Sequence, residues 1–209
     1  MRRGDGSVAA AGIACASRRL TLWARERIGN VSRASQKEEK SRRDTTGLNN
    51  LSSAFNTAHI ALGANLGDRH RNIKAALDIL RGTEGVQIRA VSELIETDAV
   101  GGPPGQPRYL NGAAVLDTTL SAGALLSLLL VIENMQGRVR PEDQRDGPRT
   151  LDLDLLLFGG KIINESGLRI PHPRMHEREF VLRPLAQIDP DAMHPELHKT
   201  ISELLNSLQ

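Results

Sequence analysis

The chain has 209 residues, which is enough for one domain of ordinary size together with additional sequence. Its single cysteine, Cys15, excludes an intramolecular disulfide and a zinc site built from cysteines. The formal net charge of +2 is unevenly distributed, because residues 1–58 hold 11 Lys and Arg against 5 Asp and Glu, whereas residues 59–209 hold 16 against 20. The basic charge therefore lies in the first part, and the basic pI does not indicate a nucleic-acid surface on the rest.

Residues 1–58 are predicted to be a mostly disordered N-terminal extension, because their polar and charged content cannot bury enough surface to offset the ordering entropy. A signal peptide is an alternative, since two arginines precede an apolar stretch at residues 8–16, but that stretch is short and broken by Gly12. An organellar presequence is another alternative, against which Glu26 counts. No apolar run approaches the roughly 20 residues that a membrane-spanning helix needs, so we expect no membrane segment.

Residues 59–209 are predicted to form the folded domain, which begins with an apolar strand at residues 59–63. A core-facing helix is expected over residues 72–81, because apolar side chains recur there at helical spacing, at Ile73, Ala76, Leu77 and Leu80. Alternation of apolar and polar residues predicts a half-buried strand at residues 86–97. Residues 98–107 contain three glycines and three prolines and are expected to be a loop.

The second half of the predicted domain again alternates strands and helices. A strand is predicted at residues 110–118, and Ser121 can cap a long helix that ends near Met135. A highly charged loop at residues 138–148 leads into a strand at residues 151–158, followed by a hairpin at about residues 161–170, a short helical region after His172 and a C-terminal helix from about Thr200. The order strand–helix–strand–strand–helix–strand predicts an α+β fold, specifically a ferredoxin-like split βαββαβ sandwich with an antiparallel sheet flanked by helices.

Two carboxylates interrupt the last of these predicted strands. Asp152 and Asp154 lie two residues apart, so in a strand they point to the same face. Neighbouring carboxylates repel each other and are costly to bury, and a bound divalent cation removes both problems. Carboxylate oxygens suit Mg²⁺, which fills its other positions with water and substrate phosphates. The alternative is a structural network in which each carboxylate pairs with an arginine such as Arg149.

Several motifs occur in a fixed order along the folded part, while no Walker A or glycine-rich dinucleotide motif is present. They are IALGANLG at residues 60–67, YLN at 109–111, GRVR at 137–140, GPRTLDLD at 147–154, IPH at 170–172 and REF at 178–180. Together they resemble the 6-hydroxymethyl-7,8-dihydropterin pyrophosphokinase family of folate biosynthesis. The resemblance covers about residues 59–205 and none of the first 58.

The resemblance implies an enzyme that transfers pyrophosphate from ATP to 6-hydroxymethyl-7,8-dihydropterin and releases AMP. It implies two Mg²⁺ ions held by Asp152 and Asp154, with catalytic roles for these two residues and for Arg140 and Arg149. The implied ATP-binding residues are Arg138, Arg140, Arg145, Arg149, Leu155, His172 and Arg178. The implied pterin-binding residues are Asn65, Thr97, Tyr109, Asn111 and Phe180, and Glu133 is implied to support the site. A cytoplasmic monomer that binds small molecules, with no nucleic acid, no membrane and no second enzyme fused after the domain, is expected.

Other interpretations remain open at this point. The alternatives are a solvated surface for the arginines, a structural role for His172, and core filling for Tyr109 and Phe180, and for Arg149, His172 and the two aromatic residues the functional interpretation is preferred. A phosphoryl or nucleotidyl transferase with another acceptor would use the same carboxylates and arginines. A nucleic-acid-binding protein that acts through the basic extension is a third class.

Overall fold

The computed structural model describes residues 55–137 and 147–209. The chain divides into two units, residues 1–52 and 53–209, and all described elements belong to the second. Residues 1–54 of the predicted extension and residues 138–146 of the predicted charged loop lie outside the described residues, so the disorder of the extension and the charged loop stay predictions. The strand predicted from residue 59 begins at Asn56, inside the predicted extension. None of the helices in the described part is long and apolar enough to cross a membrane.

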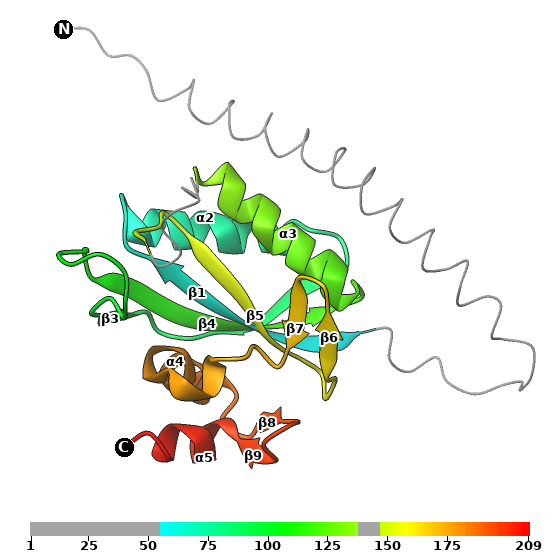
Figure 1. Cartoon of the computed structure of the whole chain (residues 1–209). Coiled ribbons are helices and arrows are strands. Elements are labelled where there is room, and N and C mark those ends of the chain that lie inside the picture. The colour runs from blue at the N-terminus through cyan, green and yellow to red at the C-terminus, as the bar shows by residue number, and fades with distance from the viewer. Residues whose placement is uncertain (1–54, 138–146) are drawn as a thin grey trace, which may run out of the picture. The chain divides into compact units, whose positions relative to one another are not determined.

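An antiparallel sheet forms the centre of the fold (Figure 1). Its strands lie in the order β2 (Val86–Val91), β4 (Tyr109–Thr118), β1 (Asn56–Ala64) and β5 (Asp152–Phe158). A further short strand, β3 (Ile95–Thr97), also pairs with β4, next to β2 along the same edge. The predicted α+β class with an antiparallel sheet and flanking helices is thereby confirmed.

The prediction of a single strand at residues 86–97 is wrong, because the chain leaves the sheet between β2 and β3. Ser92 turns its hydroxyl toward β4 and accepts a hydrogen bond from the backbone N–H of Ala113 at 2.9 Å. The Leu94 side chain lies over Gly112, where an added Cβ would meet the leucine Cδ2 at only 2.6 Å. Leu94 thus packs onto Gly112, and the alternation of side chains between the two faces of a continuous strand is interrupted there.

Two helices cover one face of the sheet (Figure 1). In α2 (Arg69–Arg81) the buried residues are the predicted stripe of Ile73, Ala76, Leu77 and Leu80, and Asp68 caps its N-terminus. In α3 (Ala122–Met135) the predicted cap is confirmed, because the Ser121 side chain accepts from the N–H of Ala124 at 3.2 Å. Helix α2 packs against β1 and β2, α3 packs against β5, and this face holds the larger apolar core.

The opposite face of the sheet carries the C-terminal elements. Helix α4 (Glu179–Ile188) packs against β4 and β1, and α5 (Ile201–Asn206) packs against α4. The predicted hairpin is confirmed as β6 (Ile163–Glu165) with β7 (Leu168–Ile170), and a 3-10 turn, η1 (Met175–Glu177), precedes α4. The two-residue strands β8 (Met193–His194) and β9 (Lys199–Thr200) were not predicted, because segments this short carry no periodicity. Thr200 caps α5 through a capping box with Glu203.

Candidate active site

Three neighbouring strands bring polar side chains into one row on the α4 face of the sheet. On the central strand β1, Gly63 lies opposite Asn111 of β4 on one side and opposite Asp152 of β5 on the other. Ala61, two residues earlier on the same face, lies opposite Asp154. An added Cβ at Gly63 would be 3.3 Å from the Asn111 Oδ1 and 3.7 Å from the Asp152 Cβ. The small residues of β1 therefore leave a hollow between the polar side chains of its neighbours.

A cavity of about 210 Å³ opens above this row. The sheet supplies its floor, and α4, the segment before it and the loop after β3 supply its walls. It brings together residues that are up to 120 positions apart in the sequence, from Ala61 to Val181. The predicted site residues that line it are Thr97, Tyr109, Asn111, Arg149, Asp152, Asp154, His172, Arg178 and Phe180.

Both carboxylates face this cavity and each has an arginine nearby. The Arg149 Nη1 donates to the Asp152 Oδ2 at 2.8 Å, and the Arg178 Nη1 lies 3.8 Å from the Asp154 Oδ2. Burial raises the pKa of Asp154, and the negative charge of Asp152 raises it further. Burial alone would lower the pKa of Arg149, but the Asp152 carboxylate outweighs this effect and the pKa is raised. The site thus concentrates negative charge that the two arginines only partly neutralise.

His172 lies beside the carboxylates, held by two backbone groups. The backbone N–H of His172 donates to the carbonyl oxygen of Leu156 at 2.9 Å, and the ring Nδ1 accepts from the backbone N–H of Arg174 at 3.3 Å. Burial lowers the pKa of His172, and the nearby Asp154 carboxylate opposes this shift without cancelling it. Because Nδ1 accepts a hydrogen bond, the neutral ring carries its proton on Nε2, which can donate to an anionic ligand.

Aromatic side chains line the same cavity, next to the charged groups. Tyr109 from β4 and Phe180 from α4 are both half-buried and line it. The Arg178 guanidinium lies over the Phe180 ring at 5.7 Å from its centre. The Asn111 Nδ2 donates to the Thr97 Oγ1 at 2.7 Å, which orients its amide toward the floor. One cavity therefore combines charged groups with aromatic side chains that can cover a flat ring.

The donor set fits Mg²⁺ better than a metal that needs a protein cage. Among the described residues, no group of three or more His, Cys, Asp or Glu side chains could hold a metal ion. A pair of carboxylates beside an open cavity is nevertheless what Mg²⁺ uses when water and substrate phosphates complete its shell. Burial and the neighbouring Asp152 raise the pKa of Asp154, and a bound cation would oppose both effects. The alternative of paired arginines is also present, at 2.8 Å for Asp152 and more loosely for Asp154.

Comparison with known proteins decides the family. Residues 59–190 match the family described as 7,8-dihydro-6-hydroxymethylpterin-pyrophosphokinase (HPPK). The chain belongs to this family. A Pseudomonas aeruginosa protein named 2-amino-4-hydroxy-6-hydroxymethyldihydropteridine pyrophosphokinase is 47% identical over 138 residues, which cover 66% of this chain and 83% of that protein. A Bacillus subtilis protein of the same name is 47% identical over 133 residues, covering 64% of this chain and 78% of the relative.

Solved structures support the fold. The wild-type HPPK-DHPS of Plasmodium falciparum with pterin and p-hydroxybenzoate aligns with a TM-score of 0.57 at 17% identity, over 76% of this chain and 44% of that one. The present chain thus spans less than half the length of this solved chain. At such low identity the likeness shows the fold alone, and the HPPK assignment rests on the sequence matches.

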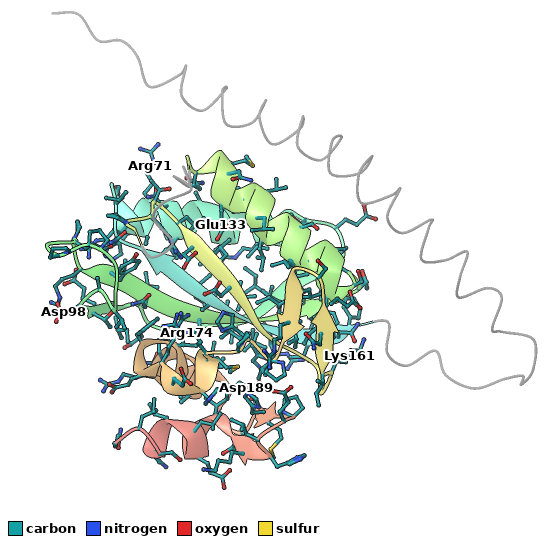
Figure 2. The ribbon with its side chains drawn as sticks, viewed as in Figure 1. Arg71, Asp98, Glu133, Lys161, Arg174 and Asp189 are labelled. Atoms are coloured by element: carbon teal, nitrogen blue, oxygen red, sulfur yellow. The ribbon has the colours of Figure 1, made fainter. Side chains whose placement is uncertain are left out.

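Three residues predicted from the resemblance lie outside the cavity lining. Glu133 of α3 is buried and its Oε1 accepts from the N–H of Leu153 at 2.8 Å, between the two carboxylate residues (Figure 2). Leu155 is buried in the core on the α2–α3 face, so a contact of its side chain with ATP has no support in the cavity. Asn65 is 2% exposed and bonds to neighbouring loops. The predicted Arg138, Arg140 and Arg145 lie outside the described residues.

The sequence reasoning missed part of the lining. Val100, which is 68% exposed, lines the cavity together with Asp98 and Gly101, all from the loop after β3. Ala61 and Gly63 form the floor. The small residues alternate along β1, and that pattern could have indicated a hollow face, whereas nothing in the loop sequence distinguishes Val100.

Proposed function

We propose that this protein transfers the pyrophosphoryl group of ATP to the hydroxymethyl oxygen of 6-hydroxymethyl-7,8-dihydropterin, giving the pterin diphosphate and AMP in folate biosynthesis. The observation that carries the proposal is a single cavity lined by paired carboxylates and arginines and by two aromatic side chains. A phosphoryl donor and a flat acceptor need these two environments side by side. The family assignment and the names of its relatives support the same reaction.

The charged groups of the cavity bind the triphosphate in this proposal. Arg149 and Arg178 present planar guanidinium groups that bind two phosphate oxygens each and stay charged at any working pH. His172 offers its Nε2–H to a further oxygen. These groups hold the β-phosphorus in line with the acceptor oxygen and stabilise the charge that develops as the bond to AMP breaks. The arginines leave their carboxylate partners for phosphate when the substrate binds.

Asp152 and Asp154 are proposed to hold two Mg²⁺ ions in this position. The ions would supply positive charge to the phosphate oxygens and to the carboxylates. The chain's own contribution is rigidity, because β5 is paired to β1 along its length and Glu133 fixes the peptide between the two carboxylates. Both acids are therefore held to the same side of the strand before substrate arrives.

The aromatic side chains are proposed to bind the pterin. Tyr109 and Phe180 cover the faces of the bicyclic ring, where stacking contributes about 0.5–1.5 kcal/mol beyond burial. Asn111 offers a donor and an acceptor to the edge of the ring, and Thr97 orients its amide at 2.7 Å. The glycine at position 63 keeps the floor low enough for the ring to approach the carboxylates.

We also infer a ferredoxin-like class for the sheet, supported by the strand order β2-β4-β1-β5 with α2 and α3 on one face. A monomer and a cytoplasmic location stay predictions, which sedimentation and fractionation would test.

The decisive assay measures AMP formed from ATP and Mg²⁺ by the full-length protein, with and without the hydroxymethyl-dihydropterin. AMP should appear only with the pterin, in a one-to-one ratio to the pterin diphosphate. AMP release that ignores the pterin would point to another acceptor and overturn the proposal. Omission of Mg²⁺ in the presence of a chelator should abolish turnover.

A further inference from the structure

Asn65, in the loop between β1 and α2, is predicted from the resemblance to contact the pterin, yet its side chain is occupied elsewhere. Its Oδ1 accepts from the backbone N–H of Arg149 at 2.6 Å. Its Nδ2 donates to the carbonyl oxygen of Pro107 at 3.3 Å and to the Gln106 Oε1 at 3.4 Å. With 2% of its surface exposed, Asn65 has little left to offer a ligand.

Gln106 continues the same series of hydrogen bonds. Its Nε2 donates to the carbonyl oxygen of Gly101 at 3.0 Å, and Gly101 lines the cavity with Asp98 and Val100. Two side-chain amides therefore join Arg149, in the lining of the cavity, to the loop that walls it. We call this series the amide relay, which consists of Asn65 and Gln106.

The two ends of the amide relay are anchored differently. At Arg149, the carbonyl oxygen accepts from the backbone N–H groups of Asn65 at 2.9 Å and of Leu66 at 3.1 Å, so the peptide is held from both sides. At the loop, the attachment is through side chains, and the flanking Gly101, Gly102 and Gly105 all have positive φ. The Arg149 end is thus held by backbone bonds, whereas the loop is held by the amide relay and by an exposed ion pair between the Arg108 Nε and the Asp98 Oδ1 at 3.1 Å.

We propose that Asn65 and Gln106 are positioning residues that set the loop of residues 98–101 in place relative to Arg149. The inference rests on the proposed function, because in it the amide relay holds the loop that lines the pterin site while Arg149 binds the phosphates of ATP. Neither residue touches a substrate. Their loss should weaken pterin binding far more than nucleotide binding or the chemical step.

Gln106→Ala in the full-length protein carries the main test. The pterin KM should rise about tenfold, as expected when hydrogen bonds of roughly 1.4 kcal/mol are lost. Turnover at saturating pterin and the affinity for a non-hydrolysable ATP analogue should stay within twofold. A role in general loop stability would shift all three quantities together, so an unchanged pterin KM, or equal changes in all three, would overturn the inference.

Asn65→Asp removes the two donor bonds and keeps the acceptor for Arg149. In the double variant with Gln106→Ala, the two effects on pterin KM should not add, because both cut one series. If burial of a carboxylate unfolds Asn65→Asp, Asn65→Ala takes its place in the double variant, since it also removes both donor bonds. Additive effects would contradict a single relay.

Asn72→Ala is the matched control. The Asn72 Nδ2 donates to the carbonyl oxygens of Leu66 at 3.2 Å and Thr150 at 3.0 Å, so its loss loosens the same two segments without cutting the relay. Its pterin KM should stay within twofold of wild type, and a rise like that of Gln106→Ala would overturn the inference. If the wild-type protein forms no AMP in response to the pterin, the proposed function is overturned. If the wild-type protein is active but the relay variants do not change the pterin KM, only the inference about the relay is overturned.

Discussion

The two faces of the central sheet use the same strands for opposite purposes. Toward α2 and α3, β1 presents Ile60 and Leu62 and β5 presents Leu153, all within a dry core. Toward α4, the alternate residues are small on β1 and acidic on β5, and they border a cavity. A shift of one residue in either strand would exchange the two sets.

Alternate side chains of the same strands therefore serve different purposes: those on one face stabilise the fold, and those on the other line the candidate active site. The α2–α3 face is filled by apolar side chains from β1, β2, β4, β5, β7, α2 and α3, and Glu133 brings a charge into it. The α4 face has a smaller apolar cluster around Leu182 and Leu185, set to one side of the cavity. Changes on one face should therefore alter folding, and changes on the other should alter turnover.

Asp154→Asn should show the largest effect on turnover. Removing one of the two carboxylates should lower kcat by about 10³-fold, the scale expected when a group that stabilises transition-state charge is lost. The fold should not suffer, because the raised pKa means that the ionised carboxylate is unfavourable in the folded state. The measurements are AMP formation and thermal unfolding on the same preparation.

Asp117→Asn is the matched control for that variant. Asp117 also lies in the sheet, on β4, but it pairs with Arg89 at 2.6 Å, away from the cavity lining. Its kcat should stay within twofold of wild type. Near-normal turnover of Asp154→Asn, or an equal loss in both variants, would break the division between the faces.

Leu116→Ala tests the opposite face. Leu116 of β4 is fully buried in the larger core. Its truncation should lower the free energy of unfolding by about 2–5 kcal/mol, through lost burial and a residual cavity. Denaturant titration measures this loss, while kcat per folded molecule should remain within about twofold. A large loss of kcat in the folded fraction would show that the two faces are coupled.

The elements of the α2–α3 face were predictable from the sequence, because the spacing of apolar residues along a helix or strand reflects which side chains are buried. The stripe from Ile73 to Leu80 and the cap at Ser121 depend only on neighbours along the chain, and both are present. The break between β2 and β3 depends on Leu94 meeting Gly112, a contact between distant segments that local alternation does not report. The same limit applies to the two-residue pair of β8 and β9.

The site was predictable in its residue types more than in its contacts. Motifs named the residues that the fold gathers around one cavity, from Thr97 to Phe180. They could not tell that Asn65 is consumed by hydrogen bonds to two loops, since those partners are 41 and 84 positions away. Side-chain orientation decides between a ligand contact and a positioning role, and orientation follows from tertiary packing.

Gly63→Ala should give an intermediate effect, confined to the α4 face. The added methyl would lie 3.3 Å from the Asn111 Oδ1, so the amide must move and the floor rises. The pterin KM should rise by about tenfold, with a change of only about 1 kcal/mol in unfolding free energy. Steady-state kinetics with varied pterin measures the shift.

Gly123→Ala provides the control for this substitution. Gly123 lies in α3, and an added Cβ there would meet no atom within 4 Å. Alanine should stabilise the helix by about 0.5–1 kcal/mol and leave the pterin KM unchanged. If both alanine variants raise KM alike, the low floor at position 63 is not what admits the pterin.

The smallest effect concerns pH and lies beyond α4, at the far side of the smaller cluster. His194 is buried, and its Nδ1 accepts from the N–H of Leu197 at 3.2 Å. Burial lowers the pKa of His194, and the neighbouring His176 lowers it further. The unfolded chain therefore takes up this proton near pH 6.5 while the folded protein resists it, so stability should fall as pH drops below about 6.5 and level off below the folded pKa. His194→Asn keeps an acceptor for Leu197 and should flatten this part of the stability profile, measured by denaturant titration between pH 5 and 8. Because the cavity is untouched, kcat at pH 7.5 should not change, and an unaltered slope in the variant would place the titration elsewhere.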